Sequence, residues 1–129
     1  MRRFPTLILI FLGACMPAPQ QRPPLMGAAY QLVDVDKLAA ATPGVFELPP
    51  TERRRALKVG DQAKIILEVT PGSPPREYTG ERPWLDIIEV RPGPRYLGRL
   101  ANELVVFTEI DANVPIDFGP EHIVEVLVK

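Results

Sequence analysis

Hydrophobic and polar residues alternate through the second half of the chain, which is the pattern of half-buried β-strands. Residues 62–69 show it clearly, because four apolar side chains share one face: Ala63, Ile65, Leu67 and Val69. Residues 80–90 form a second strand of this kind, in which neither face is purely apolar. Shorter strands are expected at residues 30–35, 96–100, 104–107, 114–118 and 122–128.

Two short helices are predicted ahead of the main strands. Asp36 is expected to cap a helix over residues 37–41, and Thr51 to cap another over residues 52–57. The second helix carries three consecutive arginines, Arg53, Arg54 and Arg55. Successive helix positions point to different sides, so a solvated helix face is expected here rather than a shared site for phosphates or carboxylates.

Many short strands separated by turns predict a mainly β fold. The chain has 9 glycines and 16 prolines, and turns are expected at residues 91–95, 101–103 and 119–120. The predicted fold class is therefore mainly β (α+β). We expect a small antiparallel, SH3-like, partly closed barrel with one or two short N-terminal helices at one end. Closure would hide strand edges that otherwise invite aggregation.

The N-terminus has a different pattern, in which Arg2 and Arg3 precede an apolar run that ends in Leu-Gly-Ala-Cys at residues 12–15. This run resembles a bacterial lipobox, in which the thiol of Cys15 receives a diacylglycerol and signal peptidase cuts before it. The segment is shorter than the ~20 residues that span a bilayer. A plain secretory signal, or an N-terminal anchor with an incidental cysteine, is the alternative.

The lipobox interpretation divides the chain into three parts. Residues 1–14 are the lipoprotein signal peptide, residues 15–27 a proline-rich tether, and residues 28–129 the β-rich domain. Proline favours the extended polyproline II conformation, which suits a spacer; a proline-rich ligand for a partner domain is the alternative. Met16, rather than Asp, follows the cysteine. This residue indicates an outer-membrane location facing the periplasm if the cell is Gram-negative.

Charge and composition narrow the function classes. Removing Arg2 and Arg3 from the 15 basic residues leaves 13 against 16 acidic ones, a balance that argues against a nucleic-acid partner. The single cysteine belongs to the lipobox, and the chain has one histidine, His122, and one serine, Ser73. No enzyme, metal site or cofactor is expected, because such sites need several convergent reactive groups.

Four short motifs in the predicted domain resemble a family of small bacterial domains of unknown function. They are G-D at residues 60–61, G-E-R-P-W-L at 80–85, Y-L-G-R-L-A-N at 96–102 and G-P-E-H-I at 119–123. The resemblance extends over residues 43–125 and implies a fold rather than an activity.

The polar and aromatic members of these motifs are the candidate binding residues: Glu81, Arg82, Trp84, Asn102 and His122. The unperturbed pKa of a histidine, ~6.5, suits a general acid or base. In that role His122 would work with a carboxylate, Glu121 or Glu81. The simpler interpretation is preferred: His122 starts a strand and satisfies a turn carbonyl. In the same way, Glu81 and Arg82 are expected to form a surface pair, Asn102 to adopt a turn, and Trp84 to anchor the core or its rim.

The sequence thus predicts a lipid-anchored envelope lipoprotein whose β domain binds an envelope protein or has a structural role, without catalysis. Its partners would be the membrane, through Cys15, and a macromolecule of the envelope. One alternative is an immunity-like inhibitor that neutralises a basic toxin or hydrolase through four acidic residues, Asp111, Asp117, Glu121 and Glu125. The other is a hydrolase that uses His122 and a carboxylate.

Overall fold

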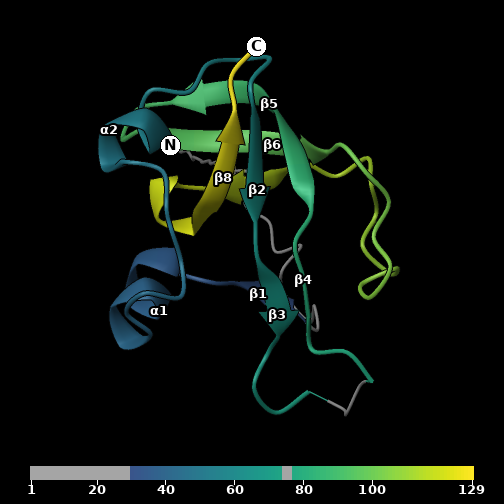
Figure 1. Ribbon diagram of the computed structural model, residues 1–129. Coiled ribbons are helices and arrows are strands. Elements are labelled where there is room, and N and C mark those ends of the chain that lie inside the picture. The colour runs from purple at the N-terminus through teal and green to yellow at the C-terminus, as the bar shows by residue number, and fades with distance from the viewer. Residues whose placement is uncertain (1–29, 74–76) are drawn as a thin grey trace, which may run out of the picture.

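The computed structural model describes residues 30–73 and 77–129. The predicted signal peptide, Cys15 and the tether lie outside the described residues. Figure 1 shows the elements, which follow in chain order: β1 (Tyr30–Leu32), α1 (Val35–Ala41), α2 (Thr51–Arg54), β2 (Gln62–Ile65), β3 (Leu67–Val69), β4 (Gly80–Glu81), β5 (Trp84–Arg91), β6 (Arg95–Leu100), β7 (Ile116–Phe118), the 3-10 helix η3 (Pro120–His122) and β8 (Ile123–Leu127).

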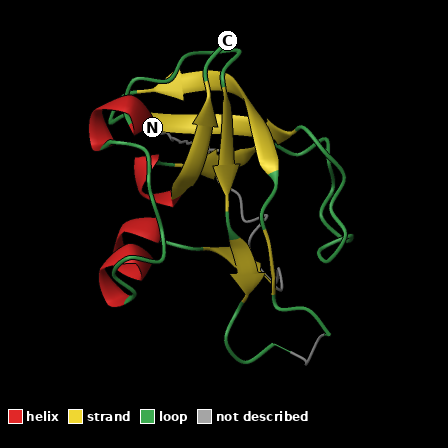
Figure 2. Cartoon of the chain, viewed as in Figure 1, coloured by secondary structure: helices red, strands yellow, loops and turns green. Residues whose placement is uncertain are grey.

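The strands form two antiparallel sheets, which confirms the predicted mainly β, α+β class. The larger sheet has the order β7-β6-β5-β2-β8, and the smaller one has the order β1-β3-β4. The larger sheet has two ends, because β7 and β8 each have one neighbour. The expected barrel was only partly closed, and in the described part of the chain the two sheets do not close into a barrel (Figure 2).

Each of the two long predicted strands is shared between both sheets. The first is interrupted at Ile66, between β2 and β3, and the second at residues 82–83, between β4 and β5. Pro83 has no backbone N–H to donate to a neighbouring strand, which accounts for the second interruption. The smaller sheet therefore extends away from the larger one instead of closing it (Figure 1).

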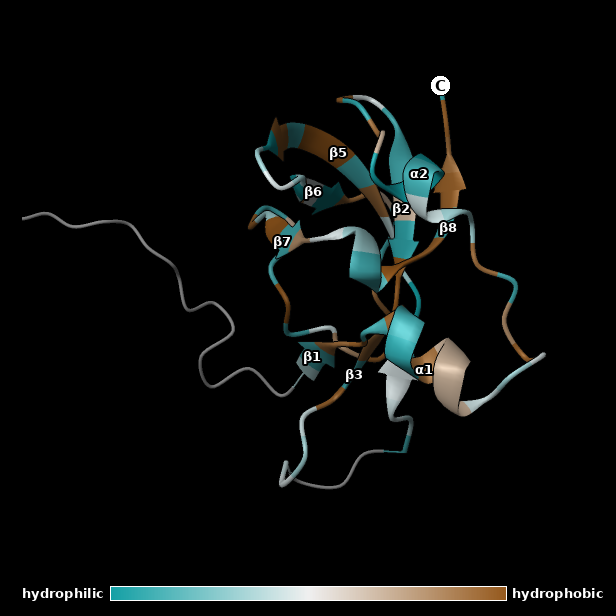
Figure 3. Cartoon of the chain, turned by 90° about the vertical axis from the view of Figure 1, so that its left-hand side faces the viewer, coloured by the Kyte–Doolittle hydropathy of each residue, from teal (hydrophilic) through white to brown (hydrophobic). Residues whose placement is uncertain are grey.

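The main core takes side chains from both sheets and confirms the predicted buried face of residues 62–69. Ala63, Ile65 and Leu67 are fully buried, and Val69 packs against the same cluster. The other buried members come from nearly every strand and from two loops: Tyr30, Leu57, Leu85, Ile87, Tyr96, Phe107, Ile116, Phe118 and Ile123. Figure 3 shows this alternation as hydrophobic and hydrophilic segments along the strands, whereas α2 is hydrophilic.

A close backbone approach in this core explains the glycine of the Y-L-G-R-L-A-N motif. A Cβ atom on Gly98 would lie 2.9 Å from Cε1 of Phe118 and 3.0 Å from Cβ of Leu85. Only glycine lets the Phe118 ring pack directly on the β6 backbone. There it also meets Tyr96, with ring centroids 5.6 Å apart.

A second, smaller cluster joins α1 to the sheets. Its buried members are Val33, Val35, Ile66 and Val124, and Leu38 and Leu48 pack against it. Ile66 points away from the main core, as alternation requires, and is buried because α1 covers that side. The point where the strand passes between sheets is therefore packed on both faces.

Both helices differ from the sequence prediction in their ends. Asp34, not Asp36, caps α1, because the Lys37 N–H donates to Oδ1 of Asp34 at 3.0 Å. Thr51 is the first residue of α2 rather than its cap, and the helix ends at Arg54 instead of continuing to residue 57. The reason is Leu57, which is buried in the main core and donates its N–H to the Tyr96 hydroxyl at 3.3 Å.

The solvated face predicted for the three arginines is wrong for Arg54, which is only 4% exposed. Its Nε donates to the Pro49 carbonyl at 2.9 Å, and its Nη1 to the Pro120 carbonyl at 2.9 Å. Its Nη2 donates to Oδ1 of Asp36 at 3.0 Å. One guanidinium thus joins α1, the approach to α2, and η3.

Replacing Arg54 with lysine should lower the free energy of unfolding by about 2–3 kcal/mol, because an ammonium cannot reach three separate acceptors and each bond to a charged group contributes roughly 1.5–3 kcal/mol. Urea unfolding at neutral pH measures the loss. Arg53→Lys is the matched control, since Arg53 is exposed, and its effect should stay within about 0.5 kcal/mol. Equal stabilities of the two variants would contradict the role assigned to Arg54.

Candidate functional site

The Glu81 carboxylate organises the loop that follows β6. Its oxygens accept three consecutive backbone N–H groups: Oε2 that of Val105, and Oε1 those of Val106 and Phe107, at 2.8 and 3.1 Å. The strand expected at residues 104–107 is therefore absent, because these N–H groups bond to a side chain rather than to a neighbouring strand. The expected surface pair of Glu81 with Arg82 is also wrong.

Asn102 and Trp84 hold the start of the same loop. The Trp84 N–H donates to Oδ1 of Asn102 at 2.9 Å, and the Ala101 N–H donates to the Trp84 carbonyl at 2.9 Å. Asn102 thus lies in the bend that follows β6. The Trp84 ring is partly buried, and Nζ of Lys64 lies 5.0 Å from its centroid. This spacing is typical of a cation–π contact across two paired strands.

Arg82 points toward another part of the chain. Its side chain is exposed, and its Cζ lies 5.7 Å from the centroid of Phe46, in the connection between α1 and α2. Arg82 therefore holds that connection against the β4–β5 junction, while Glu81 holds the loop after β6.

His122 lies in η3, on the side of the molecule where the short helices gather (Figure 2). Its Nδ1 accepts the Gly119 N–H at 3.0 Å, so the neutral ring carries its proton on Nε2. The sequence interpretation had this residue start a strand and satisfy a carbonyl; instead it accepts an N–H and ends a 3-10 turn. Its Nε2 lies 3.7 Å from Oε2 of Glu121.

Burial lowers the pKa of His122 below its ordinary value of 6.5, because the charged ring would be poorly solvated. Arg95 lowers it further, whereas Glu121, Asp34 and Asp117 act in the opposite direction. The net result is a ring that stays neutral at pH 7 and keeps Nδ1 free to accept the Gly119 N–H.

The five candidate residues therefore do not form one site. Glu81, Trp84 and Asn102 meet at the β4–β5 junction, Arg82 contacts Phe46, and His122 lies in η3. The side chains of Glu81, Asn102 and His122 accept backbone N–H groups of the loop after β6, of the first residue of β5 and of the turn before η3, respectively. This arrangement stabilises the fold, and it separates His122 from Glu81, one of the carboxylates considered for hydrolysis.

The acidic residues considered for an immunity-like inhibitor are largely neutralised. Asp117 accepts hydrogen bonds from Arg91 and Arg95, and Glu121 accepts one from Arg95 at 3.0 Å. Glu125 pairs with Lys64 at 3.0 Å. Asp111 accepts the Asn113 N–H at 2.9 Å. A basic partner would have to compete with the arginine and lysine side chains that already pair with three of these four carboxylates.

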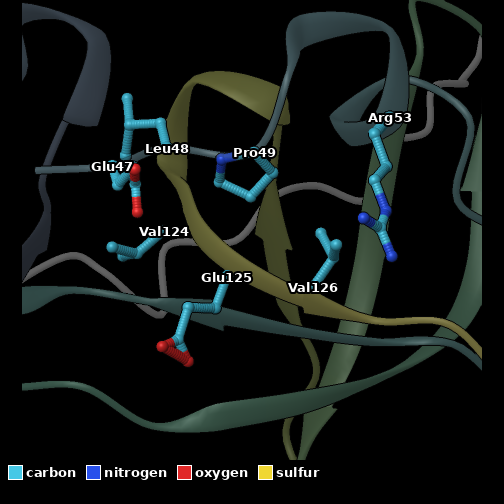
Figure 4. A pocket seen from close by; sticks show the side chains of 7 residues that line it. All are labelled: Glu47, Leu48, Pro49, Arg53, Val124, Glu125 and Val126. Atoms are coloured by element: carbon cyan, nitrogen blue, oxygen red, sulfur yellow. The ribbon is translucent and has the colours of Figure 1, made fainter.

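A groove that the sequence did not reveal lies beside β8. It has a volume of about 340 Å³ and is lined by residues of the α1–α2 connection, α2 and β8: Glu47, Leu48, Pro49, Arg53, Val124, Glu125 and Val126 (Figure 4). These residues come from two stretches about 70 positions apart in the sequence. No local sequence motif predicts such a groove, because it forms only when η3 and Arg54 hold the α1–α2 connection next to β8.

Two further observations concern the described residues only. No group of three or more His, Cys, Asp or Glu side chains there is arranged to hold a metal ion. No helix there is long and apolar enough to cross a membrane.

Comparisons with protein-family models, curated proteins and solved structures found no match to this chain. The fold and geometry define it as a small α+β domain with two antiparallel sheets. The resemblance to a family of bacterial domains stays a prediction.

Glu81→Gln should release the loop at residues 105–107, because an amide oxygen accepts more weakly than a carboxylate and its NH₂ group faces N–H donors. We expect a loss of about 1–3 kcal/mol in unfolding free energy and faster hydrogen exchange at Val106 and Phe107. The control is Glu103→Gln, an exposed carboxylate in the same loop. Unchanged exchange in the Glu81 variant would show that the carboxylate does not hold the loop.

Protonation of His122 should destabilise the fold in mild acid. Since its pKa is lower in the folded chain than in the unfolded chain, the unfolded state takes up the proton first, and stability falls as pH drops below about 6.5. His122→Asn keeps an acceptor for the Gly119 N–H but does not titrate, so its unfolding free energy should fall less between pH 7 and pH 5. Urea titrations of both proteins measure this, and parallel pH profiles would refute it.

Proposed function

We propose that the protein is a lipid-anchored lipoprotein of the bacterial cell envelope, whose β-rich domain binds another envelope protein or supports one without catalysis. The observation that carries the proposal is the run Leu-Gly-Ala-Cys at residues 12–15, behind two arginines and an apolar stretch. In a Gram-negative cell, Met16 after the acylated cysteine favours the outer membrane, with the domain facing the periplasm.

The length of chain between the lipid and the domain is consistent with this arrangement. Fourteen residues separate Cys15 from Tyr30, the first residue of β1. At no more than ~3.5 Å per residue they reach up to roughly 50 Å. This is enough for the domain to clear the lipid headgroups and meet a partner in the surrounding space.

The uses of the polar side chains favour binding or support over catalysis. Glu81, Asn102 and His122, the residues best suited to chemistry, bond to backbone groups that shape loops and turns. A catalyst needs groups that are free to exchange protons with a substrate. A binding domain needs a rigid surface, which such bonds provide.

Lipid attachment can be tested directly, because the chain has one cysteine. Cells expressing the tagged chain are grown with a clickable palmitate analogue, and the isolated protein is assayed for label and for N-terminal mass. We expect label, membrane association and cleavage before Cys15 in the wild type. We expect all three to be lost in Cys15→Ala.

The control is Gln20→Ala, which leaves the four residues of the lipobox unchanged and should be labelled like the wild type. Equal labelling of the wild type and Cys15→Ala would mean that Cys15 is not acylated. An uncleaved wild-type chain in the cytosol would overturn the proposed location as well.

A further inference from the structure

Two charged side chains at opposite ends of the groove beside β8 have no partner in the part of the chain that the structure describes. The side chains of Arg53 and Glu47 make neither a hydrogen bond nor an ion pair there, whereas the side chains of the neighbouring Arg54 and Arg55 are both bonded. Figure 4 shows Glu47 near Val124 and Arg53 near Val126. The two ends of the groove therefore carry opposite charges, a carboxylate at one end and a guanidinium at the other.

Four apolar side chains line the groove between these charges. Leu48 and Pro49 lie on one side, and Val124 and Val126 on the other. Leu48 and Val124 also belong to the small cluster beneath α1, so they are fixed by packing. Glu125 adds little free charge, because Lys64 already pairs with it.

One wall of the groove is an open strand edge. β8 is the last strand of the larger sheet and pairs only with β2. The connection between α1 and α2 runs past it (Figure 1), but among the described residues no backbone hydrogen bond joins residues 43–50 to β8. The edge thus keeps backbone groups that a further strand can use.

A bulge in β8 shapes this edge. Lys64 pairs with Glu125, but the next residue, Ile65, pairs with Ile123, so Val124 is the extra residue. A bulge redirects the side chain of the inserted residue, which here turns Val124 from the main core toward the groove and α1. The open part of the edge is then the straight run from Glu125 to Leu127.

From these features we infer that the groove binds an extended peptide segment of a partner protein, added along the edge of β8. An acidic side chain of the peptide meets Arg53, a basic one meets Glu47, and apolar side chains between them rest on Leu48, Pro49, Val124 and Val126. Backbone pairing supplies affinity in this mode of recognition, and the charges set the direction of the peptide. The inference rests on the binding role proposed above, but not on the lipid anchor.

The test uses two blocked peptides of the same composition and opposite charge order, acetyl-Glu-Val-Thr-Val-Lys-amide and acetyl-Lys-Val-Thr-Val-Glu-amide. Each is titrated into the full ¹⁵N-labelled chain in detergent micelles, and amide shifts are followed by NMR. Antiparallel pairing places the N-terminal end of the peptide at the Arg53 end of β8. The peptide that begins with Glu should therefore bind about three- to tenfold more tightly, as expected for two exposed charge pairs, with shifts at residues 47–53 and 123–127.

The decisive variant exchanges the two charges of the groove, Arg53→Glu with Glu47→Lys, and should invert the preference. The control exchanges two exposed charges elsewhere, Arg99→Glu with Glu103→Lys, and should leave the preference unchanged. A preference that does not invert, equal binding of the two peptides, or no shifts along β8 would each overturn the inference. Palmitate labelling of Cys15 is independent of all these outcomes, so failure of the groove and failure of the anchor are distinguishable.

Discussion

The arrangement of the helices depends on the hydrogen bonds that the buried guanidinium of Arg54 donates. α1 has seven residues and α2 has four, both too short to be stable alone. α2 also lacks an apolar face to bury. A buried cation must find acceptors, and Arg54 finds them on three segments at once. The Tyr96 hydroxyl donates to the Arg54 carbonyl at 2.7 Å, which links the end of α2 to the start of β6.

Buried or half-buried carboxylates hold the loops in place in a similar way, by accepting backbone N–H groups. Asp61 is 3% exposed and accepts the N–H groups of Lys58 and Lys129 at 2.8 and 3.0 Å, closing a turn and holding the C-terminal end of the chain. Burial by itself would raise the pKa of Asp61, but these hydrogen bonds and the two lysine charges lower it below its ordinary value. Glu81 does for residues 105–107 what a neighbouring strand would otherwise do. Short strands leave many backbone groups unpaired, and ionised side chains satisfy them.

This use of polar residues has a consequence for function. His122 and Glu81 lie in separate parts of the fold, where each bonds to backbone N–H groups. Glu121 lies beside His122 but already pairs with Arg95. In the part of the chain that the structure describes, the side chains of Arg53 and Glu47 are among the charged groups without a partner, and they lie at the two ends of a groove along an open strand edge. The groove proposed for recognition thus lies where Arg53 and Glu47 are not needed to hold the fold together.

Alternation along residues 62–69 and 80–90, and the turns between later strands, were enough to predict antiparallel strands, their buried faces and the fold class, because these features depend on neighbours in the sequence. The run that predicts a lipobox is likewise a local pattern. The open sheets, the loop at residues 104–107, the burial of Arg54 and the groove were not predictable in this way. They depend on partners far apart in the chain, such as Arg54 and Pro120, which are 66 residues apart. A charged residue is expected to be exposed when only its sequence neighbours are known, because the acceptors that allow its burial come from distant segments. A short apolar run forms a strand only where another strand can pair with it.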